Sequence, residues 1–316
     1  MKLTLLAVLA MAAVPDPEVV VAPASAPLTP AAGAETVEVQ TDRYRRLTVP
    51  VHIDGQGPFD FMVDTGSEAT VVTNRLRERV PMAPAGSAVV VGMASRVPVE
   101  LVALDGLEFA ARVFDNLRVP LLDANHVGAD GILGLDTLQD LRVLIDFRAD
   151  TMAVDDGDSL GGNTGYEIVI RARRKLGRLI ITDATIDKVR TAVILDTGAQ
   201  SSIGNMALQR RLRARKRETI SSKDVNGFEI SGTVDLIKSL RIDAMQLTNL
   251  PIMFADGPAF DQLGLGDRPA MILGIQDLRV FDRVAIDFAT RQILFDTPAS
   301  AANHSRLHLG GHPSRL

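Results

Sequence analysis

The sequence predicts an all-β protein of two homologous lobes, because its main landmarks occur twice in the same order. An apolar, strand-like run ends in Asp-Thr-Gly at residues 64–66 and again at 196–198. Each copy is followed by Ile-Leu-Gly, at 132–134 and 272–274, and then by another apolar strand. The spacing from aspartate to leucine is 69 residues in the first copy and 77 in the second. An ordered repeat of this kind indicates an internal duplication.

Each Asp-Thr-Gly is expected at the end of a buried strand. Residues 59–63 and 192–195 are mostly apolar, and each run stops at a carboxylate that is followed by a small hydroxyl residue and a glycine. This pattern is typical of a strand that leads into a tight turn. If the two turns face each other, Asp64 and Asp196 form a carboxylate pair.

These motifs resemble those of a known family. Asp-Thr-Gly followed at this distance by two hydrophobic residues and a glycine is similar to the aspartic proteases, and two copies in one chain resemble a fused pair of retropepsin-like lobes. The resemblance covers residues 47–295, and it is closer to retropepsin-like bacterial proteins than to pepsin, since the chain has no cysteine for the disulfides usual in pepsins. It implies two β-barrel lobes with pseudo-two-fold symmetry and an active-site cleft between them.

The resemblance also implies an aspartic endopeptidase. Two carboxylates about 3 Å apart do not both ionise easily, so such a pair shares one proton and activates a water molecule between its members. The residues expected to support the active-site loops are Thr65, Gly66, Ser67, Thr197, Gly198 and Ala199. In the resembling family the threonines hydrogen-bond across the two-fold axis. The residues expected to pack behind the loops are Ile132, Leu133, Gly134, Ile272, Leu273 and Gly274.

The two copies differ at the residue after the glycine, which is Ser67 in the first and Ala199 in the second. A serine hydroxyl that donates to a carboxylate lowers its pKa, whereas alanine cannot. We therefore expect Asp196 to hold the shared proton more often and Asp64 to carry more of the charge. On this hypothesis, Ser67→Ala moves the acid limb of the pH–rate profile upward.

Two hairpins are candidates for the flaps that close over substrate in the resembling family. The first turns near Gly92 and Met93, between apolar strands. The second turns at Asn226 and Gly227, a dipeptide typical of a two-residue hairpin turn. Ordinary surface hairpins of a β-rich lobe are the alternative for both.

The domain organisation follows from these landmarks and from the ends of the chain. We expect a signal peptide at 1–26, an extended linker or pro-segment at 27–43, the first lobe at 44–155, an interlobe linker at 156–165, the second lobe at 166–298 and a disordered tail at 299–316. Lys2 precedes an apolar run that is too short to span a bilayer, and Ala24–Ala26 or Ala10–Ala12 offers a signal cleavage pattern. Export to the periplasm or the medium is therefore predicted, with no stable membrane anchor after signal removal.

Composition narrows the range of partners. The formal net charge is −5, which gives no reason to expect a nucleic-acid partner. Without cysteine there can be no disulfide, thiol nucleophile or thiolate metal site. We expect a polypeptide substrate, no cofactor, no metal and activity as a monomer, because the fused duplication supplies both half-sites.

Three other patterns in the sequence suggest a function less strongly. Residues 157–160 match the serine block of an esterase family and 123–126 its Asp-x-x-His block, but in that family the serine block comes first. His304, His308 and His312 recur every fourth residue, yet the neighbouring glycines and proline favour a solvated tail. The arginine-rich stretch 207–218 is expected to be the solvated face of a helix. A protein that keeps the fold but only binds peptides remains the alternative to an enzyme.

Overall fold

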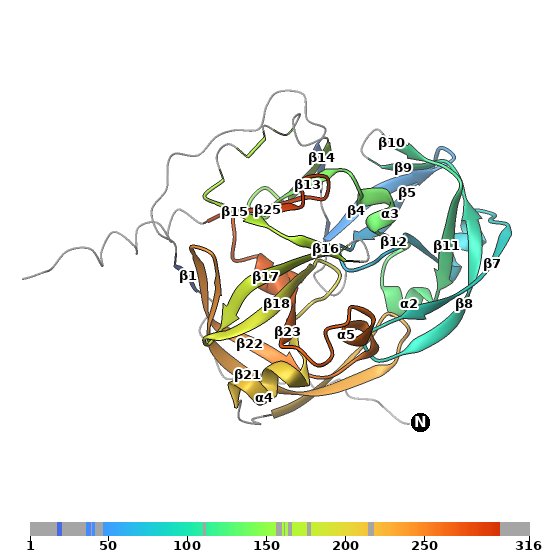
Figure 1. The fold of residues 1–316 in the computed structure, drawn as a ribbon. Coiled ribbons are helices and arrows are strands. Elements are labelled where there is room, and N and C mark those ends of the chain that lie inside the picture. The colour runs from blue at the N-terminus through green and yellow to red at the C-terminus, as the bar shows by residue number, and fades with distance from the viewer. Residues whose placement is uncertain are drawn as a thin grey trace, which may run out of the picture.

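Two β-rich lobes lie side by side in the computed structural model, and a third sheet joins them (Figure 1). The structure describes residues 18–20, 36–38, 40–41, 47–109, 112–155, 160, 162–163, 166–175, 178–213 and 218–297. Within these ranges, no helix has the length and apolar character needed to cross a bilayer. The predicted tail at 299–316 and most of the predicted linker at 156–165 lie outside the described residues.

The first lobe is built on one curled sheet with short helices at its edges. Its strands in sheet order are β10 (Arg112–Phe114), β9 (Leu107–Phe109), β4 (Leu47–Ile53), β5 (Gln56–Val63), β12 (Gly131–Leu133), β6 (Val71–Thr73), β11 (Leu117–Leu122), β8 (Arg96–Leu104) and β7 (Pro84–Val91), and β3 (Gln40–Thr41) pairs with β4. Its helices are α1 (Asn74–Arg79), α2 (Ala124–Val127) and α3 (Leu135–Leu138).

The second lobe has the same plan. Its strands in sheet order are β1 (Glu18–Val20), β22 (Met245–Phe254), β19 (Ile203–Gly204), β23 (Ala270–Gly274), β18 (Val189–Asp196), β17 (Arg178–Ile186), β21 (Glu229–Ile242) and β20 (Glu218–Lys223), and β16 (Arg173–Lys175) pairs with β17. Because β21 also pairs with β22, this sheet closes on itself as a barrel. Its helices are α4 (Met206–Leu212), α5 (Pro258–Gln262) and α6 (Ile275–Leu278).

The strand order around the two Asp-Thr-Gly turns is identical in the lobes. The path β4-β5-β12-β6-β11 in the first corresponds to β17-β18-β23-β19-β22 in the second. Parallel pairing sets Ile132 beside Met62 in the first lobe and Ile272 beside Ile194 in the second. The predicted all-β fold of two homologous lobes is therefore confirmed.

The third sheet, which sequence analysis did not predict, joins the lobes. Among the described residues its strand order is β15 (Ile168–Arg171), β25 (Gln292–Asp296), β24 (Arg283–Asp287), β13 (Arg142–Asp146), β14 (Thr151–Asp155) and β2 (Thr36–Glu38). At its centre, β13 and β24 run antiparallel, so that Arg142 lies opposite Asp287 and Asp146 opposite Arg283. Each lobe thus contributes its copy of one repeated strand, and the register is the one that a two-fold relation requires.

The centre of this shared sheet contains a buried ion pair. The side chains of Arg142 and Asp287 are 3% and 1% exposed, and Nε and Nη2 of the arginine lie 3.0 and 2.6 Å from Oδ2 of the aspartate. Arg142 also donates to the carbonyl of Gly162 and the side chain of Asn163. The two-fold relation of the strands does not extend to these side-chain contacts, because Arg283 pairs with Asp296 of its own lobe and not with Asp146 on the facing strand.

The shared sheet includes a short strand from the predicted linker. Residues Thr36–Glu38, which we assigned to the linker 27–43, form β2 and pair with β14. This strand holds the place that β15 holds on the opposite side, so it belongs to the interlobe framework. Residues Glu18–Val20, inside the predicted signal peptide, form β1 beside β22. The signal peptide stays a prediction, and the rest of 1–35 lies outside the described residues.

The arginine-rich helix is shorter than predicted. Helix α4 ends at Leu212, and Arg213 adopts a left-handed conformation with φ 52°. A residue in that conformation ends a right-handed α-helix, because its φ has the opposite sign to the helical value. The chain then enters β20 at Glu218, so the expectation of a helix through residue 218 is wrong at its C-terminal end.

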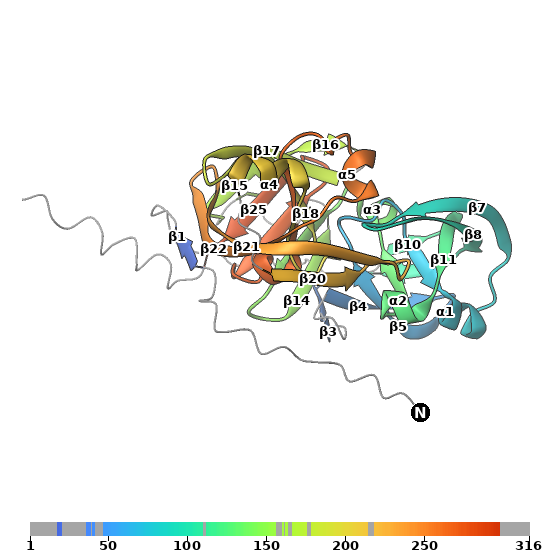
Figure 2. The ribbon, with the colours of Figure 1, turned by 90° about the horizontal axis from the view of Figure 1, so that it is seen from below.

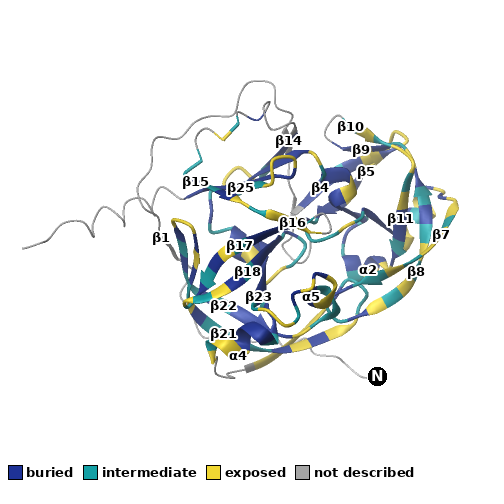
Figure 3. Ribbon diagram, in the orientation of Figure 1, coloured by how far each residue is buried: buried dark blue, intermediate teal, exposed yellow. Residues whose placement is uncertain are grey.

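Two long hairpins extend from the lobes toward each other. Strands β7 and β8 form the first, and β20 and β21 form the second, which reaches from the second lobe to α2 of the first (Figure 2). Exposed and half-buried residues alternate along much of β7 and β8, in contrast to the buried strands at the lobe centres (Figure 3). The first hairpin therefore covers its neighbours with one face and meets solvent with the other, whereas residues 219–223 of β20 in the second hairpin are all exposed.

Candidate active site

The two aspartates end equivalent strands. Asp64 follows β5, and its N–H donates to the carbonyl of Leu133 at 3.1 Å. Asp196 is the last residue of β18, which pairs in parallel with β23. In both copies the carboxylate accepts hydrogen bonds from the backbone amides two and three residues further along the chain, at 2.7–3.0 Å. These amides belong to Gly66 and Ser67 in the first copy and to Gly198 and Ala199 in the second.

The glycines show that the carboxylates meet across the two loops. A Cβ atom on Gly66 would lie 2.5 Å from Cγ of Asp196, and one on Gly198 would lie 2.4 Å from Cγ of Asp64. These separations are too short for any side chain, so glycine is required in each loop by the carboxyl group of the other. The structure thus brings Asp64 and Asp196 together, as the sequence predicts.

The threonines fasten the loops to each other. The Thr65 hydroxyl donates to the carbonyl of Leu195 at 3.0 Å and accepts from the N–H of Thr197 at 3.2 Å. In the reciprocal direction, the Thr197 hydroxyl donates to the carbonyl of Val63 at 2.7 Å and accepts from the N–H of Thr65 at 3.1 Å. Both threonines are buried. This crossed network fixes the separation of the aspartates.

The environment of Asp196 favours a bound proton. Its pKa is raised from 3.8 to about 7, first by burial, then by the negative charge of Asp64, and also by a hydrogen bond between the two carboxyl groups. The N–H of Ala199 and the guanidinium of Arg178 act in the opposite direction. Burial and the neighbouring negative charge therefore favour the protonated form of Asp196, within a pair that titrates as a unit.

The cause that we expected for this asymmetry is wrong. The Ser67 hydroxyl donates to the carbonyl of Ala69 at 2.7 Å, inside its own loop. The backbone N–H of Ser67 donates a hydrogen bond to the carboxylate of Asp64. The backbone N–H of Ala199 donates an equivalent hydrogen bond to Asp196. The Ser67 hydroxyl therefore does not contact the Asp64 carboxylate, and the raised pKa of Asp196 has other causes, which are burial and the charge of Asp64.

The Ile-Leu-Gly segments lie behind the loops as predicted. Leu135 follows Gly134 and donates its N–H to the Ser67 carbonyl, and Ile275 follows Gly274 and donates to the Ala199 carbonyl, at 2.9 and 2.8 Å. A Cβ on Gly134 would lie 2.3 Å from the backbone of Ala69, and one on Gly274 would lie 2.7 Å from the backbone of Ser201. These glycines allow two backbone segments to touch.

A layer of hydroxyl and carboxyl groups that was not predicted from the sequence lies beneath the loops. Six residues after each aspartate, Thr70 and Ser202 accept a hydrogen bond from the N–H of the Ile-Leu-Gly glycine and donate to the carboxyl group of a second aspartate. The acids are Asp136 and Asp277, whose pKa is raised by burial, to about 6 for Asp277. Alignment of the two copies would have shown the repeated hydroxyl position.

A second missed residue is Arg178, which crosses between the lobes. It begins β17 of the second lobe, and its Nε donates to the carbonyl of Gly66 in the first lobe at 2.6 Å. Its Nη1 lies 2.6 Å from Oε1 of Glu68. The guanidinium thus holds the Asp64 loop while its charge lowers the pKa of Asp196. The sequence gives no local signal for a contact 112 residues apart.

Replacement of Arg178 by methionine is expected to raise the pKa of Asp196 further above its value of about 7. The direction follows from the loss of a positive charge that stabilises the ionised form, so the protonated pair persists to higher pH. Titration of the side-chain carboxyl carbons by ¹³C NMR measures this change, as macroscopic values of the pair. Ser67→Ala is the control and is expected to leave the titration unchanged. An unmoved or lowered value in Arg178→Met would contradict the assignment.

The flap candidates lie at the hairpin tips and contact one another. Gly92 and Met93 lie in the turn between β7 and β8, and a Cβ on Gly92 would lie 3.2 Å from Nδ2 of Asn226. The Asn226–Gly227 turn is not the predicted two-residue turn, because the connection runs from Asp224 to Phe228 and of its residues only Gly227 has a positive φ, of 83°. The Asp224 carboxylate accepts the amides of Asn226 and Phe228 and so stabilises the longer turn.

The residues of the esterase alternative do not form a site in the described chain. Asp123 caps α2 by accepting the N–H of Asn125, and His126 packs against the backbone of Gly227. Ser159 and the three histidines of the tail lie outside the described residues.

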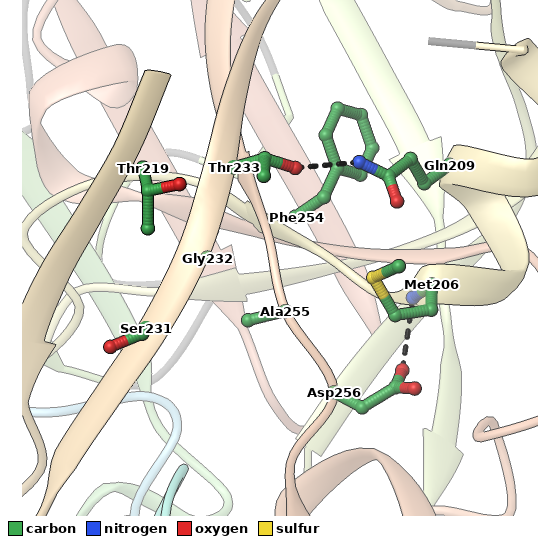
Figure 4. A pocket seen from close by; sticks show the side chains of 9 residues that line it. All are labelled: Met206, Gln209, Thr219, Ser231, Gly232, Thr233, Phe254, Ala255 and Asp256. Carbon is green, nitrogen blue, oxygen red and sulfur yellow. Dashed lines mark hydrogen bonds between the residues drawn. The ribbon is translucent and has the colours of Figure 1, made fainter. Parts of the chain in front are cut away.

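A pocket of about 240 Å³ lies on the second lobe between α4, the β20–β21 hairpin and the segment after β22 (Figure 4). Its lining residues are Met206, Gln209, Thr219, Ser231, Gly232, Thr233, Phe254, Ala255 and Asp256. The Gln209 side chain donates to Thr233 Oγ1 at 2.7 Å, and Asp256 accepts the N–H of Met206 at 2.9 Å. Neither aspartate of the pair lines this pocket, so it is separate from the candidate active site.

Comparison with known proteins agrees with this geometry. No curated protein matches the chain significantly. A family model described as aspartyl protease matches twice, at residues 49–137 and 182–276. Each match contains one Asp-Thr-Gly turn and its Ile-Leu-Gly segment, and together they cover more than half of the chain. The carboxylate pair, its crossed threonines and the duplicated match lead to one conclusion, that this chain belongs to the aspartyl protease family.

Proposed function

We propose that the chain is an aspartic endopeptidase in which the Asp64 and Asp196 pair activates water. The observation that carries the proposal is the meeting of the carboxyl groups, each within contact distance of the glycine of the opposite loop. A pair held this closely shares one proton, which is the protonation state that acid–base hydrolysis requires.

The reaction proceeds in two proton-coupled steps. Asp64, as the ionised member, takes a proton from a water molecule whose oxygen attacks the peptide carbonyl carbon, while Asp196 gives its proton to the carbonyl oxygen. The resulting tetrahedral diol then collapses, the C–N bond breaks, and the leaving nitrogen receives the proton from Asp64. Asp196 recovers a proton from the diol hydroxyl. No covalent bond to the enzyme forms at any stage.

The proposal is tested by incubating the full chain with a diverse peptide mixture from about pH 3 to 8 and identifying the products by mass spectrometry. The Asp64→Asn and Asp196→Asn variants are the controls. Cuts that disappear in both variants support a single-chain aspartic endopeptidase, and the flanking residues give its specificity. Cuts that persist in both variants would come from a contaminating protease and would contradict the assignment.

A peptide-binding protein without turnover is the alternative function. It is favoured if no peptide is cut at any pH but peptides are retained on the immobilised chain. The presence of both aspartates, both threonines and both loop glycines supports the enzyme, because binding alone does not need a pair of carboxyl groups in contact.

The setting of the activity is also part of the proposal. We infer processing of exported proteins by a monomer, on the basis of the apolar N-terminus and of two half-sites in one chain. Expression in a bacterial host, followed by N-terminal sequencing of the protein recovered from the periplasm, tests export and gives the cleavage site. Recovery of the uncut chain from the cytoplasm would contradict export.

A further inference from the structure

A buried acid that the proposed reaction does not use lies beneath the loop of Asp196. Asp277 belongs to α6 and is 6% exposed. Its Oδ2 accepts the hydroxyl of Ser202, which is 1% exposed. The Ser202 oxygen in turn accepts the N–H of Gly274 at 3.1 Å, and Gly274 is the strand partner of Asp196. Two hydrogen bonds therefore connect Asp277 to the backbone beside Asp196.

The segment that carries Asp277 is also attached to the Asp196 loop by its backbone. The N–H of Ile275 donates to the carbonyl of Ala199 at 2.8 Å, and the next N–H donates to the carbonyl of Gln200 at 3.2 Å. Residues 199–202 continue the loop that begins at Asp196. A change in the contact between α6 and this loop is therefore passed to the carboxyl group of Asp196.

The first lobe makes the same contact from a different sequence spacing. Oδ1 of Asp136 accepts both the N–H and the hydroxyl of Thr70, at 2.8 and 2.7 Å. Asp136 stands two residues after the Ile-Leu-Gly glycine, whereas Asp277 stands three residues after it. Both copies still bring a carboxyl group to the hydroxyl beneath the loop. The two acids differ in their surroundings, because Asp277 is buried and more of Asp136 is exposed to solvent.

The surroundings of Asp277 bring its titration into the range where the aspartate pair works. Burial raises the pKa of Asp277 from 3.8 to about 6, and the hydrogen bond from Ser202 acts in the opposite direction. Charged residues on the neighbouring elements are Asp196, at the end of β18, and Arg279, directly after α6. The Arg279 guanidinium lies 5.5 Å from the centre of the Phe147 ring. Among the described residues, no charged side chain contributes to the shift of Asp277.

The contact between Ser202 and Asp277 depends on the charge of the acid. An ionised carboxylate only accepts, so the Ser202 hydroxyl donates to it and its oxygen stays available to the N–H of Gly274. Such a charge-assisted hydrogen bond is about twice as strong as a neutral one. In the hydrogen bonds of the described residues, Asp277 is also the sole acceptor of the Ser202 proton. Ionisation of Asp277 therefore tightens the connection to Gly274.

We propose that Asp277 is a positioning residue for Asp196, and that it holds the Asp196 loop most firmly when it is ionised. The inference rests on the proposed endopeptidase function and adds a group that controls its pH dependence. The cleavage rate is expected to rise as Asp277 loses its proton near pH 6. It falls again when the pair loses its shared proton, near pH 7.

The first test is the pH dependence of peptide cleavage in Asp277→Asn. Asparagine keeps the shape of the acid but carries no charge at any pH, so the rise in kcat near pH 6 is expected to disappear. At about pH 6.5 kcat should fall by at least about threefold, with KM nearly unchanged. Asp267→Asn is the matched control, because Asp267 is exposed and its side chain takes part in no hydrogen bond or ion pair of the described residues.

Replacements of Ser202 test the route by which Asp277 acts. Ser202→Ala removes the hydroxyl between Asp277 and Gly274, so this variant is expected to lose the rise in kcat near pH 6 as well. Ser202→Thr keeps a hydroxyl, as Thr70 does at the equivalent position of the first lobe, and is expected to retain the rise. Loss of the rise in both variants, or in neither, would contradict the route through the hydroxyl.

The third measurement does not depend on activity. The amide signal of Gly274 is followed by NMR from about pH 4 to 8 in the full chain. In the wild type its chemical shift is expected to change with a midpoint near pH 6, because the hydrogen bond from this amide to Ser202 responds to the charge of Asp277. The change should be absent in Asp277→Asn and present in Asp267→Asn.

The outcomes separate the two proposals. If the wild type cleaves no peptide, the endopeptidase function fails, and the Gly274 titration still decides whether Asp277 acts on the loop. If the wild type cleaves peptides without a rise near pH 6, or if Asp277→Asn keeps that rise, the inference is overturned. A Gly274 amide that does not respond near pH 6 would overturn it as well.

Discussion

Replacement of Asp196 by asparagine is expected to slow peptide cleavage by at least about 10³-fold and, at the same time, to stabilise the fold at neutral pH. The loss of rate follows from the loss of the proton donor of the pair, since a positioned acid or base contributes about 10²–10⁴-fold and the partner loses its counterpart as well. Asp64→Asn is expected to lose activity to a similar degree.

The gain in stability follows from the raised pKa of Asp196, which is about 7 in the folded chain against 3.8 for the free group. Between these values the folded state binds a proton that the unfolded state has released, so the free energy of unfolding falls as the pH rises from about 4 to 7. Each pKa unit corresponds to about 1.4 kcal/mol, and the coupling of Asp196 to Asp64 reduces the total. The free energy of unfolding is therefore expected to fall by about 2–4 kcal/mol over this whole range. Asparagine carries no charge at any pH, so the Asp196→Asn variant does not lose this stability as the pH rises.

Urea unfolding at pH 5 and pH 8 measures this effect. The wild type is expected to be less stable at pH 8 than at pH 5 by about 1–3 kcal/mol, because only the part of the effect between pH 5 and about 7 falls in this range. The difference should shrink in Asp196→Asn. The control is Asp183→Asn, which removes an acid that is 84% exposed on the neighbouring strand β17. It should change neither the cleavage rate nor the pH dependence. Retention of more than a tenth of the activity in Asp196→Asn would refute the assigned role.

Replacement of Arg142 by methionine is expected to destabilise the chain by about 3–5 kcal/mol. The reason is that the substitution leaves Asp287 charged, 1% exposed and without its main partner at the centre of the sheet that joins the lobes. The double variant Arg142→Met with Asp287→Leu should recover most of the loss, since it removes the second charge. Urea unfolding of the single and double variants measures both effects.

The control for Arg142 is Arg148→Met. Arg148 is 62% exposed and lies 3.2 Å from Asp282, at the end of the same interlobe region. An exposed pair contributes about 0–1 kcal/mol, so this variant should be close to the wild type. A loss below about 1 kcal/mol in Arg142→Met would show that water reaches the Arg142–Asp287 pair and that it does not hold the lobes together.

Several features were predictable because they depend on local backbone requirements. The two Asp-Thr-Gly turns, the Ile-Leu-Gly segments behind them and the hairpin strands all appear where the sequence placed them. Each landmark combines an apolar strand with a glycine that has to touch another backbone or carboxyl group. Gly66 and Gly134 are examples. A position with no room for a Cβ atom requires glycine, so it can be recognised in the sequence without knowledge of the rest of the fold.

Other features were not predictable, for identifiable reasons. Thr36–Glu38 is too short to reveal a strand, and its partner β14 lies more than a hundred residues away. The turn at Asn226–Gly227 was decided by the side chain of Asp224, which competes with the two-residue turn by offering its own hydrogen bonds. Ser67 could donate to a carboxylate or to a nearby carbonyl, and only the folded loop shows that it chooses Ala69.

The sequence by itself determined that this protein has two homologous lobes and two aspartates at equivalent turns, because duplication and strand periodicity are properties of the chain order. Only the tertiary structure decided how the lobes act on each other. Arg178 reaches Gly66, and Asp224 reaches Ser95, across separations of more than one hundred residues. Such contacts depend on which surfaces the shared sheet brings together, and no local pattern of residues shows which distant parts of the chain will meet.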